Sequence, residues 1–299
     1  MRNDVYQRVT DQIVAELEKG VLPWRKPWNA EHAAGRITRP LRGNLIPYQG
    51  INVIMLWAEA VEKGFAAPIW MTFKQAQELG AHVRKGEKGS LVVFASSITR
   101  TETDEAGEES ERDIPFMKGY TVFNVEQIDG LPAKYHEPAQ ARLDPVERIT
   151  KADEFFAATR AQIRHGGNVA CYSVTSDEVR MPAFETFRDA ESFYATLAHE
   201  MAHWTRHPSR LDRDFGRKRF GDEGYAMEEL VAELGAAFVS ADLDLTLEVR
   251  ADHAAYIGNW LKVLKEDRRA IFTAASHAQR AADFLNGLQQ SAATQERAA

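Results

Sequence analysis

The sequence predicts an α+β protein with two domains, and three observations support this class. The 299 residues are enough for two units of ordinary size, since domains average roughly 150 residues. Clusters of β-branched and aromatic residues occur among helical apolar patterns in the first half, whereas helical patterns dominate the second. Pro132, Pro138 and Pro145 punctuate the stretch between them. We therefore predict domains at residues 1–140 and 141–299.

The composition is that of a folded protein and excludes several classes of site. Hydrophobic residues make up 44% and charged residues 27% of the chain, unlike disordered or collagen-like sequences. Cys171 is the only cysteine, which excludes an intramolecular disulfide and a zinc site built on thiolates. The N-terminal segment is charged and amphipathic, and no apolar run approaches the roughly 18 residues of a membrane span. We expect neither export nor membrane insertion, and hence a cytoplasmic location.

The first domain combines helices with short strands. Helical patterns cover residues 4–19, 51–63 and 72–79. The first ends near Gly20 and the last is capped by Thr72. Strand-like clusters occur at 91–94 and 120–125. The segment 101–113 between them is almost entirely charged or small, so we expect a solvated, mobile loop that connects two paired strands.

The second domain is predicted to be mainly helical. Helical patterns cover residues 151–164, 186–206, 225–242 and 251–286, the last of them broken into two. Residues 169–182 predict a β-hairpin with its turn at Ser176 and Asp177.

The sequence HEMAH at residues 199–203 has the HExxH pattern of zinc metallopeptidases. Apolar residues recur around it at helical steps, so the pattern lies on an amphipathic helix. On this helix His199 and His203 are neighbours, with Cβ atoms about 5–6 Å apart, and both imidazoles can bind one Zn²⁺ ion. Glu200 lies about 100° around the helix and is the candidate general base for a zinc-activated water. A helix that carries two histidines by chance is the alternative.

A second helix over residues 225–238 supplies candidate acidic ligands. Glu229 and Glu233 stack at i, i+4 on a largely apolar face, where carboxylates are costly to bury unless a cation neutralises them. A catalytic zinc takes three protein ligands, and two His with one Glu is a known set. We predict Glu229 as the third ligand and Glu233 as a partner that orients a ligating histidine, while Glu228 should face away. A solvated helix face is the alternative.

Three neighbouring features have more than one interpretation. His207 is a rival ligand, but it precedes Pro208 where the helix should end, and the longer HExxHxxGxxH pattern is absent. We expect His207 to interact with the free carbonyls there. Tyr225 could stabilise a developing oxyanion or simply pack. The basic stretch 206–219 could bind phosphate near the metal or pair internally.

The first third of the chain has the features of a nucleic-acid surface. Residues 1–99 carry a net charge of +4, although the whole chain carries −7. Aromatic residues are interleaved there with cations, as in proteins that stack bases and hold a single-stranded backbone. The candidate DNA-binding residues are Trp24, Arg25, Lys26, Trp28, Tyr48, Lys74, Arg84, Lys85 and Lys88. Trp57 and Phe73, on predicted helices, are expected in the core, and the basic turn at 84–90 could simply be a solvated hairpin.

Five segments are longer and more specific than HExxH alone: GVLPWRKPW at 20–28, YQGINVIMLW at 48–57, WMTFKQAQELGAHVRKGEKG at 70–89, HEMAHW at 199–204 and YAMEELVAELGAAF at 225–238. Together they resemble the ArdC antirestriction proteins of conjugative plasmids. The resemblance implies an N-terminal single-stranded-DNA-binding domain and a C-terminal zincin-like metallopeptidase domain, which protect incoming plasmid DNA from host restriction during conjugation. It carries the zinc pair over to His199 and His203, the general base to Glu200 and the acidic ligand to Glu229.

We therefore expect an antirestriction protein that binds single-stranded DNA and one Zn²⁺ ion, or another divalent metal. A host restriction component is its candidate protein target. The main alternative is a DNA-binding protein with a structural or vestigial metal and no peptidase turnover. A metal-dependent nuclease would need several carboxylates around two ions, and HExxH argues against it.

Overall fold

The computed structural model describes residues 4–24, 38–103, 109–136, 145–216, 222–245 and 253–296. Its helices are α1 (Val5–Glu18), α2 (Ile51–Lys63), α3 (Phe73–Glu78), α4 (Pro145–Ala158), α5 (Ala190–Trp204), α6 (Glu223–Leu243), α7 (His253–Glu266) and α8 (Ala270–Glu296). Its strands are β1 (Leu41–Arg42), β2 (Ile69–Thr72), β3 (His82–Val83), β4 (Ser90–Thr103), β5 (Glu109–Asn124), β6 (Ile128–Asp129), β7 (Gln162–His165), β8 (Cys171–Ser173) and β9 (Glu178–Met181). Short 3-10 helices are η2 (Val125–Gln127), η3 (Ala133–Tyr135) and η4 (Phe184–Thr186).

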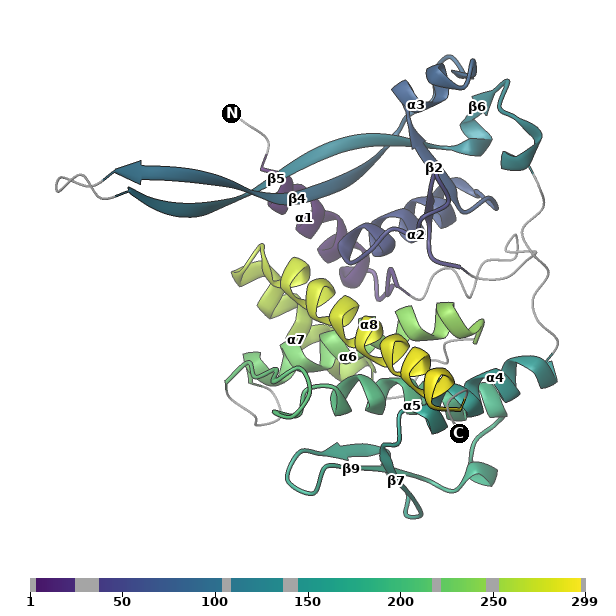
Figure 1. Cartoon of the computed structure of the whole chain (residues 1–299), viewed down its shortest axis with the longest axis vertical. Coiled ribbons are helices and arrows are strands. Elements are labelled where there is room, and N and C mark those ends of the chain that lie inside the picture. Colours follow the sequence, from purple (N-terminus) through teal and green to yellow (C-terminus); the bar gives the residue numbers. More distant parts are fainter. Residues whose placement is uncertain are drawn as a thin grey trace.

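The N-terminal unit is built on a mixed sheet with the strand order β1-β2-β5-β4. Helices α1 and α2 lie between this sheet and the helices of the second unit (Figure 1). The predicted start and cap of α3 are confirmed, because Thr72 and Gln75 form a reciprocal capping box there. The short sheet of β3 and β6 packs with α3 around a small separate core that includes Met71 and Ile128.

Strands β4 and β5 form a long two-stranded ribbon that extends away from the rest of the molecule (Figure 1). They pair antiparallel from Ser90 with Val122 to Thr103 with Glu109. The prediction of a loop at 101–113 is therefore wrong for most of that segment, because only residues 104–108 lie outside the described strands. Charge does not oppose a strand here, since the backbone groups of the ribbon pair with each other while the side chains can remain in water.

In the C-terminal unit, α5 and α6 cross closely and α8 runs over them (Figure 1). Gly235 permits this approach, because a Cβ at that position would lie 3.1 Å from the Cβ of Ala202. The predicted break in the last helical segment is confirmed at residues 267–269, between α7 and α8. The predicted helix over 151–164 ends early, at Ala158. Arg160 adopts a positive φ of 54°, so the chain leaves the helix there and enters β7.

The three-stranded sheet of the C-terminal unit has the order β7-β9-β8, and α5 contacts β8 and β9. The predicted hairpin is confirmed: β8 and β9 pair antiparallel, and Asp177 turns the chain with a φ of 49°. Strand β7 pairs with β9 in parallel, which leaves β8 at an edge of this sheet.

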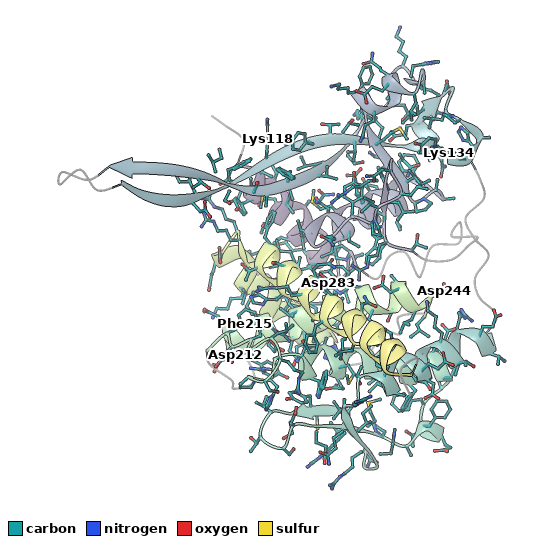
Figure 2. The ribbon with its side chains drawn as sticks, viewed as in Figure 1. Lys118, Lys134, Asp212, Phe215, Asp244 and Asp283 are labelled. Carbon is teal, nitrogen blue, oxygen red and sulfur yellow. The ribbon has the colours of Figure 1, made fainter. Side chains whose placement is uncertain are left out.

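One continuous hydrophobic core joins the two units. Side chains of both units fill the space between α2 and α8 (Figure 2). Trp24 packs edge-on against Trp260 of α7 at 5.7 Å between ring centroids. Arg39 forms a two-pronged ion pair with Asp242 of α6, with N–O distances of 2.9 and 2.7 Å. The predicted domain boundary falls among residues 137–144, which lie outside the described residues. The two units therefore depend on each other for burial of their apolar surface.

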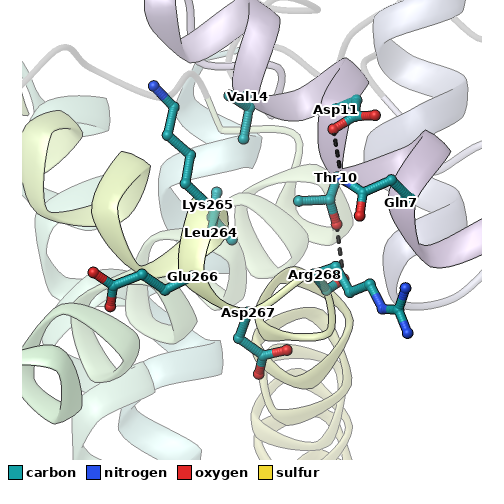
Figure 3. Close-up of a pocket in the computed structure, with 9 residues that line it drawn as sticks. All are labelled: Gln7, Thr10, Asp11, Val14, Leu264, Lys265, Glu266, Asp267 and Arg268. Carbon is teal, nitrogen blue, oxygen red and sulfur yellow. Dashed lines mark hydrogen bonds between the residues drawn. The ribbon is translucent and has the colours of Figure 1, made fainter.

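A cavity of about 410 Å³ lies where α1 meets the turn between α7 and α8 (Figure 3). At this contact the Thr10 hydroxyl donates a hydrogen bond to the carbonyl of Arg268 at 2.8 Å. Its lining residues include none of the predicted metal ligands. Among the described residues, no helix has both the length and the apolar character needed to cross a bilayer.

Candidate functional site

Helix α5 carries the HExxH residues in the interior of the C-terminal unit. Asp189 begins the helix, and its carboxylate accepts a hydrogen bond from the backbone N–H of Ser192 at 2.8 Å. His199, Glu200 and His203 are all less than a tenth exposed. The predicted amphipathic helix is thus a buried one, and a polar cluster at its centre has to be satisfied from neighbouring elements.

The Nε2 atoms of both histidines face the same carboxylate. His199 Nε2 lies 3.5 Å from Oε2 of Glu229, and His203 Nε2 lies 3.5 Å from Oε1 of Glu229. The two imidazole centroids are 4.9 Å apart. One donor atom from each of the three residues lies within 4.8 Å of the others. The structure therefore brings together the three predicted ligands from two different helices.

The Nδ1 atoms point the other way, each toward a different carboxylate. His199 Nδ1 lies 3.4 Å from Oε1 of Glu233, the residue predicted to orient a histidine. His203 Nδ1 donates a hydrogen bond to Oε1 of Glu228 at 3.0 Å. Because a carboxylate accepts this bond, the proton of a neutral His203 stays on Nδ1 and leaves Nε2 free to bind a metal.

The expectation that Glu228 faces away is wrong. Glu228 is only 3% exposed. Its side chain points toward α5 and not into solvent, because α6 is buried on nearly all sides. Arg213 holds it with two hydrogen bonds of 2.8 Å, from Nε and Nη2. The same guanidinium also donates to the Thr205 hydroxyl at 3.0 Å and to the Ala202 carbonyl at 2.9 Å. Sequence reasoning missed this partner; the signal was an arginine-rich segment between the two helices.

The basic stretch 206–219 pairs internally wherever it is described. Arg210 lies over the Trp204 ring at 3.8 Å and donates to the Trp204 carbonyl at 2.7 Å and to Asp177 at 3.0 Å. Arg210 and Arg213, rather than His207, donate to the free carbonyls at the end of α5. His207 instead pairs with the Ser209 hydroxyl at 2.7 Å. Arg217, Lys218 and Arg219 lie outside the described residues.

The donor set fits a divalent cation. Four carboxylates, those of Glu200, Glu228, Glu229 and Glu233, are buried near the two histidines, and Arg213 pairs with Glu228. Buried carboxylates in such excess are costly unless cations neutralise them. Two imidazole nitrogens and a carboxylate oxygen are also the donors that a catalytic zinc uses. A dication held by His199, His203 and Glu229 would neutralise negative charge in this cluster.

When no cation is bound, protons on the histidines neutralise part of the negative charge of the carboxylates. Burial lowers the pKa of His203, but the charge of Glu229 and the hydrogen bond to Glu228 outweigh it and raise the pKa to about 10. The pKa of Glu229 moves in the opposite direction. Burial raises it, whereas the adjacent His203 and His199 bring it well below its ordinary value.

Metal affinity is expected to rise with pH. Because the raised pKa keeps His203 protonated at neutral pH, a metal ion has to displace that proton before it can bind the imidazole. We expect affinity to increase at least about tenfold per pH unit between roughly pH 6 and pH 9, because the pKa of His199 is raised as well. Calorimetric titration in buffers with different enthalpies of ionisation counts the released protons. Binding at neutral pH without proton release would contradict this protonation state.

Glu228→Gln should weaken metal binding without removing a ligand. Partners that orient a ligating histidine typically contribute 10- to 100-fold in metal affinity, and we expect a loss in about that range here. Competition with a chromophoric chelator measures it. Glu223→Gln is the matched control on the same helix, since this side chain is 65% exposed and contacts Lys262 at 3.8 Å. Equal affinities of the two variants would show that Glu228 does not orient His203.

The predicted general base lies beside strand β8. Glu200 is 3% exposed; burial, followed by the charge of Glu200, raises the pKa of the Cys171 thiol on β8. Tyr225 lies one turn before Glu229 on α6, and its hydroxyl is 3.2 Å from that of Tyr256. Burial followed by this contact raises the pKa of Tyr225, so its hydroxyl stays protonated and can donate.

Those candidate DNA-binding residues that the structure describes do not form one exposed surface. Trp24 is 0% and Tyr48 7% exposed, so the prediction that their rings stack bases is wrong; the Trp24 ring packs against Trp260 of α7. Lys74 pairs with Glu78 at 3.7 Å, and Arg84 pairs with Glu87 at 2.8 Å. Lys85 and Lys88 are exposed. Arg25, Lys26 and Trp28 lie outside the described residues. Phe73, expected in the core, is 49% exposed, whereas Trp57 is buried as predicted.

Comparison with known proteins identifies both halves of the chain. Residues 3–123 match the N-terminal domain of the anti-restriction factor ArdC, and residues 150–277 match a zincin-like metallopeptidase family. The crystal structure of the antirestriction ArdC protein from the R388 plasmid is 48% identical and superposes with a TM-score of 0.81. That likeness covers 96% of this chain and 98% of that one. The chain belongs to the ArdC antirestriction family.

Further similar proteins also match nearly the whole of this chain. The Mn(II)-bound structure of the R388 ArdC protein is 47% identical, with a TM-score of 0.79, over 96% of this chain and 98% of that one. Protein y4eC of Sinorhizobium fredii is 45% identical over 98% of this chain and 95% of its own length. DNA primase TraC of Escherichia coli is 37% identical over 97% of this chain, which spans 28% of the primase. The His and Glu cluster lies wholly within the part that matches the zincin-like family.

Proposed function

We propose that this ArdC-family protein protects incoming plasmid DNA from restriction by combining single-stranded-DNA binding with zinc-dependent peptide hydrolysis. The observation that carries the enzymatic part is the convergence of His199 Nε2 and His203 Nε2 on Glu229, each at 3.5 Å. The family assignment supports the DNA-binding part. The protein would act in the cytoplasm, where incoming DNA meets restriction enzymes, and a host restriction component is the proposed peptide substrate.

Each residue of the cluster has a proposed role. His199, His203 and Glu229 hold the metal, which we propose to be Zn²⁺ with another divalent ion as a substitute; when bound, it supplies Lewis-acid activation of a water and of the scissile carbonyl. Glu200 accepts a proton from the attacking water on its carboxylate and returns it to the leaving amine. Glu233 and Glu228 fix the two imidazoles through their Nδ1 atoms.

The depth of the cluster favours a second candidate function. His199, Glu200, His203 and Glu229 are all less than a tenth exposed, which also suits a metal that only holds α5 and α6 together. In that case the protein would protect DNA by binding alone, without peptidase turnover. The two candidates differ in whether Glu200 is needed.

Plasmid transfer tests the proposed role directly. An unmodified conjugative plasmid is mated into restricting and non-restricting recipients, with and without this protein in the cell. We expect the protein to raise recovery of the plasmid only in the restricting recipient. An equal effect in both recipients would point to a general role in transfer and would contradict antirestriction.

A further inference from the structure

The ribbon of β4 and β5 carries an exposed aromatic cluster on one face. Side chains at alternate positions of a strand share a face, and the register pairs Val92 with Tyr120, Phe94 with Lys118 and Ser96 with Phe116. The Phe94 ring centroid lies 6.4 Å from those of both Phe116 and Tyr120. Phe94 is 52% and Tyr120 41% exposed. Phe94 therefore lies between Phe116 and Tyr120 in a row of rings that is at least partly exposed to solvent.

The same face continues as an apolar strip toward the end of the ribbon. Ile98 pairs with Ile114 in the next positions of this alternation, and these side chains are 60% and 40% exposed. Scattered apolar residues on a surface are ordinary, but a contiguous strip of this kind marks an interaction site. We call Phe94, Phe116, Lys118 and Tyr120 the ribbon platform.

A single cation stands within the ribbon platform. Lys118 Nζ lies 5.6 Å from the centroid of the Tyr120 ring, and Figure 2 shows Lys118 on the ribbon, away from the helical unit. Among the residues whose side chains are described, no carboxylate pairs with Lys118. Asp113 lies on the opposite face by the strand register and is bonded to the Thr99 hydroxyl at 2.7 Å. The platform thus combines stacking rings with a positive charge that no described partner neutralises.

More cations lie at the start of the same strand. Lys85 and Lys88 are exposed in the turn that leads into β4, and no described carboxylate forms an ion pair with either. The six steps from Lys88 to Phe94 span roughly 20 Å in an extended strand. A flexible polyanion can contact this turn and the ribbon platform together.

We propose that the ribbon platform is the surface on which this protein stacks the bases of single-stranded DNA. Aromatic rings interleaved with cations bind single strands because every base has a face to stack and every nucleotide a phosphate. A duplex offers its phosphates but keeps its bases stacked inside, so the platform favours single strands. The inference rests on the proposed single-stranded-DNA binding and assigns it to residues that differ from those predicted from the sequence.

The test uses the full-length protein and fluorescence anisotropy with two probes, a labelled oligothymidylate and an abasic oligomer of the same length. The double variant Phe94→Ala with Tyr120→Ala removes exposed rings, and circular dichroism verifies that it is folded. We expect its affinity for oligothymidylate to fall about 10- to 100-fold and its affinity for the abasic probe to change little. Lys118→Ala should weaken binding of both probes. It should also make the slope of log K against log salt concentration shallower by about 0.7.

Phe184→Ala, which removes a ring that is 43% exposed on the other unit, is the matched control and should bind like the unchanged protein. If the unchanged protein fails to bind the oligothymidylate, the proposed single-stranded-DNA binding itself is wrong. If it binds and the double variant binds equally well, only the assignment to the ribbon platform is overturned. A double variant that changes oligomeric state in sedimentation, with unaltered DNA affinity, would identify the ribbon as an interface between copies instead.

Discussion

Glu200→Gln is expected to abolish peptide hydrolysis while leaving the metal in place. A positioned general base typically contributes 10²- to 10⁴-fold to the rate, so turnover should fall by about that factor. The metal should remain, because the clustered donor atoms belong to His199, His203 and Glu229 and not to Glu200. Hydrolysis of an unfolded protein substrate gives the rate, and elemental analysis of the purified variant gives the metal content.

The same variant separates the two candidate functions in the cell. If hydrolysis underlies antirestriction, Glu200→Gln should lose protection of the plasmid in the restricting recipient. Glu154→Gln makes the same chemical change at an exposed position and should retain full protection. Full protection by Glu200→Gln, with its metal still bound, would sink the peptidase hypothesis and leave DNA binding with a structural metal. Loss of the metal would instead make Glu200 a ligand.

Trp24→Ala is expected to destabilise the whole molecule. The ring is 0% exposed and packs against Trp260, whose indole N–H donates to the Ala226 carbonyl of α6 at 3.1 Å. Truncating a buried tryptophan to alanine costs about 3–5 kcal/mol of unfolding free energy. For a chain of 299 residues that corresponds to a fall in melting temperature of roughly 5–8 °C, measured by calorimetry.

The exposed Phe73 provides a comparison of opposite character. It is 49% exposed, so Phe73→Ala should change stability by less than about 1 kcal/mol. The folded fraction of Trp24→Ala should also bind single-stranded DNA normally at low temperature, because the ring is covered. A variant with unchanged melting temperature and weakened DNA binding would show that Trp24 stacks bases after all, as its sequence context predicted.

The contrast between Trp24 and Phe73 shows where sequence reasoning failed. Trp24 stands among prolines and cations, which is typical of a functional loop, whereas Phe73 begins a helix, which is typical of a core residue. The structure reverses both assignments, because burial depends on which surface a segment meets. The partner of Trp24 is Trp260, at the other end of the chain. No local pattern around either residue records that contact.

The loop predicted for the charged segment 101–113 was wrong for a related reason. High charge predicts a solvated segment, and the side chains of a two-stranded ribbon can be solvated on both faces. Solvation does not decide between a loop and a strand, because the backbone of β4 can pair with that of β5 wherever the register continues. The helix predicted through residue 164 ended early at a local feature, the positive φ of Arg160.

The sequence by itself determined the elements of the metal cluster, because helical spacing is local. His199 and His203 share a face of one helix, and so do Glu229 and Glu233 on another, through the fixed geometry of i, i+4 positions. The tertiary structure decided the rest. It set the close crossing of α5 and α6 at Ala202 and Gly235, turned Glu228 toward His203 and brought Arg213 onto Glu228. Periodicity records which face of an element is apolar, whereas the partner of each polar side chain depends on packing between elements far apart in the chain.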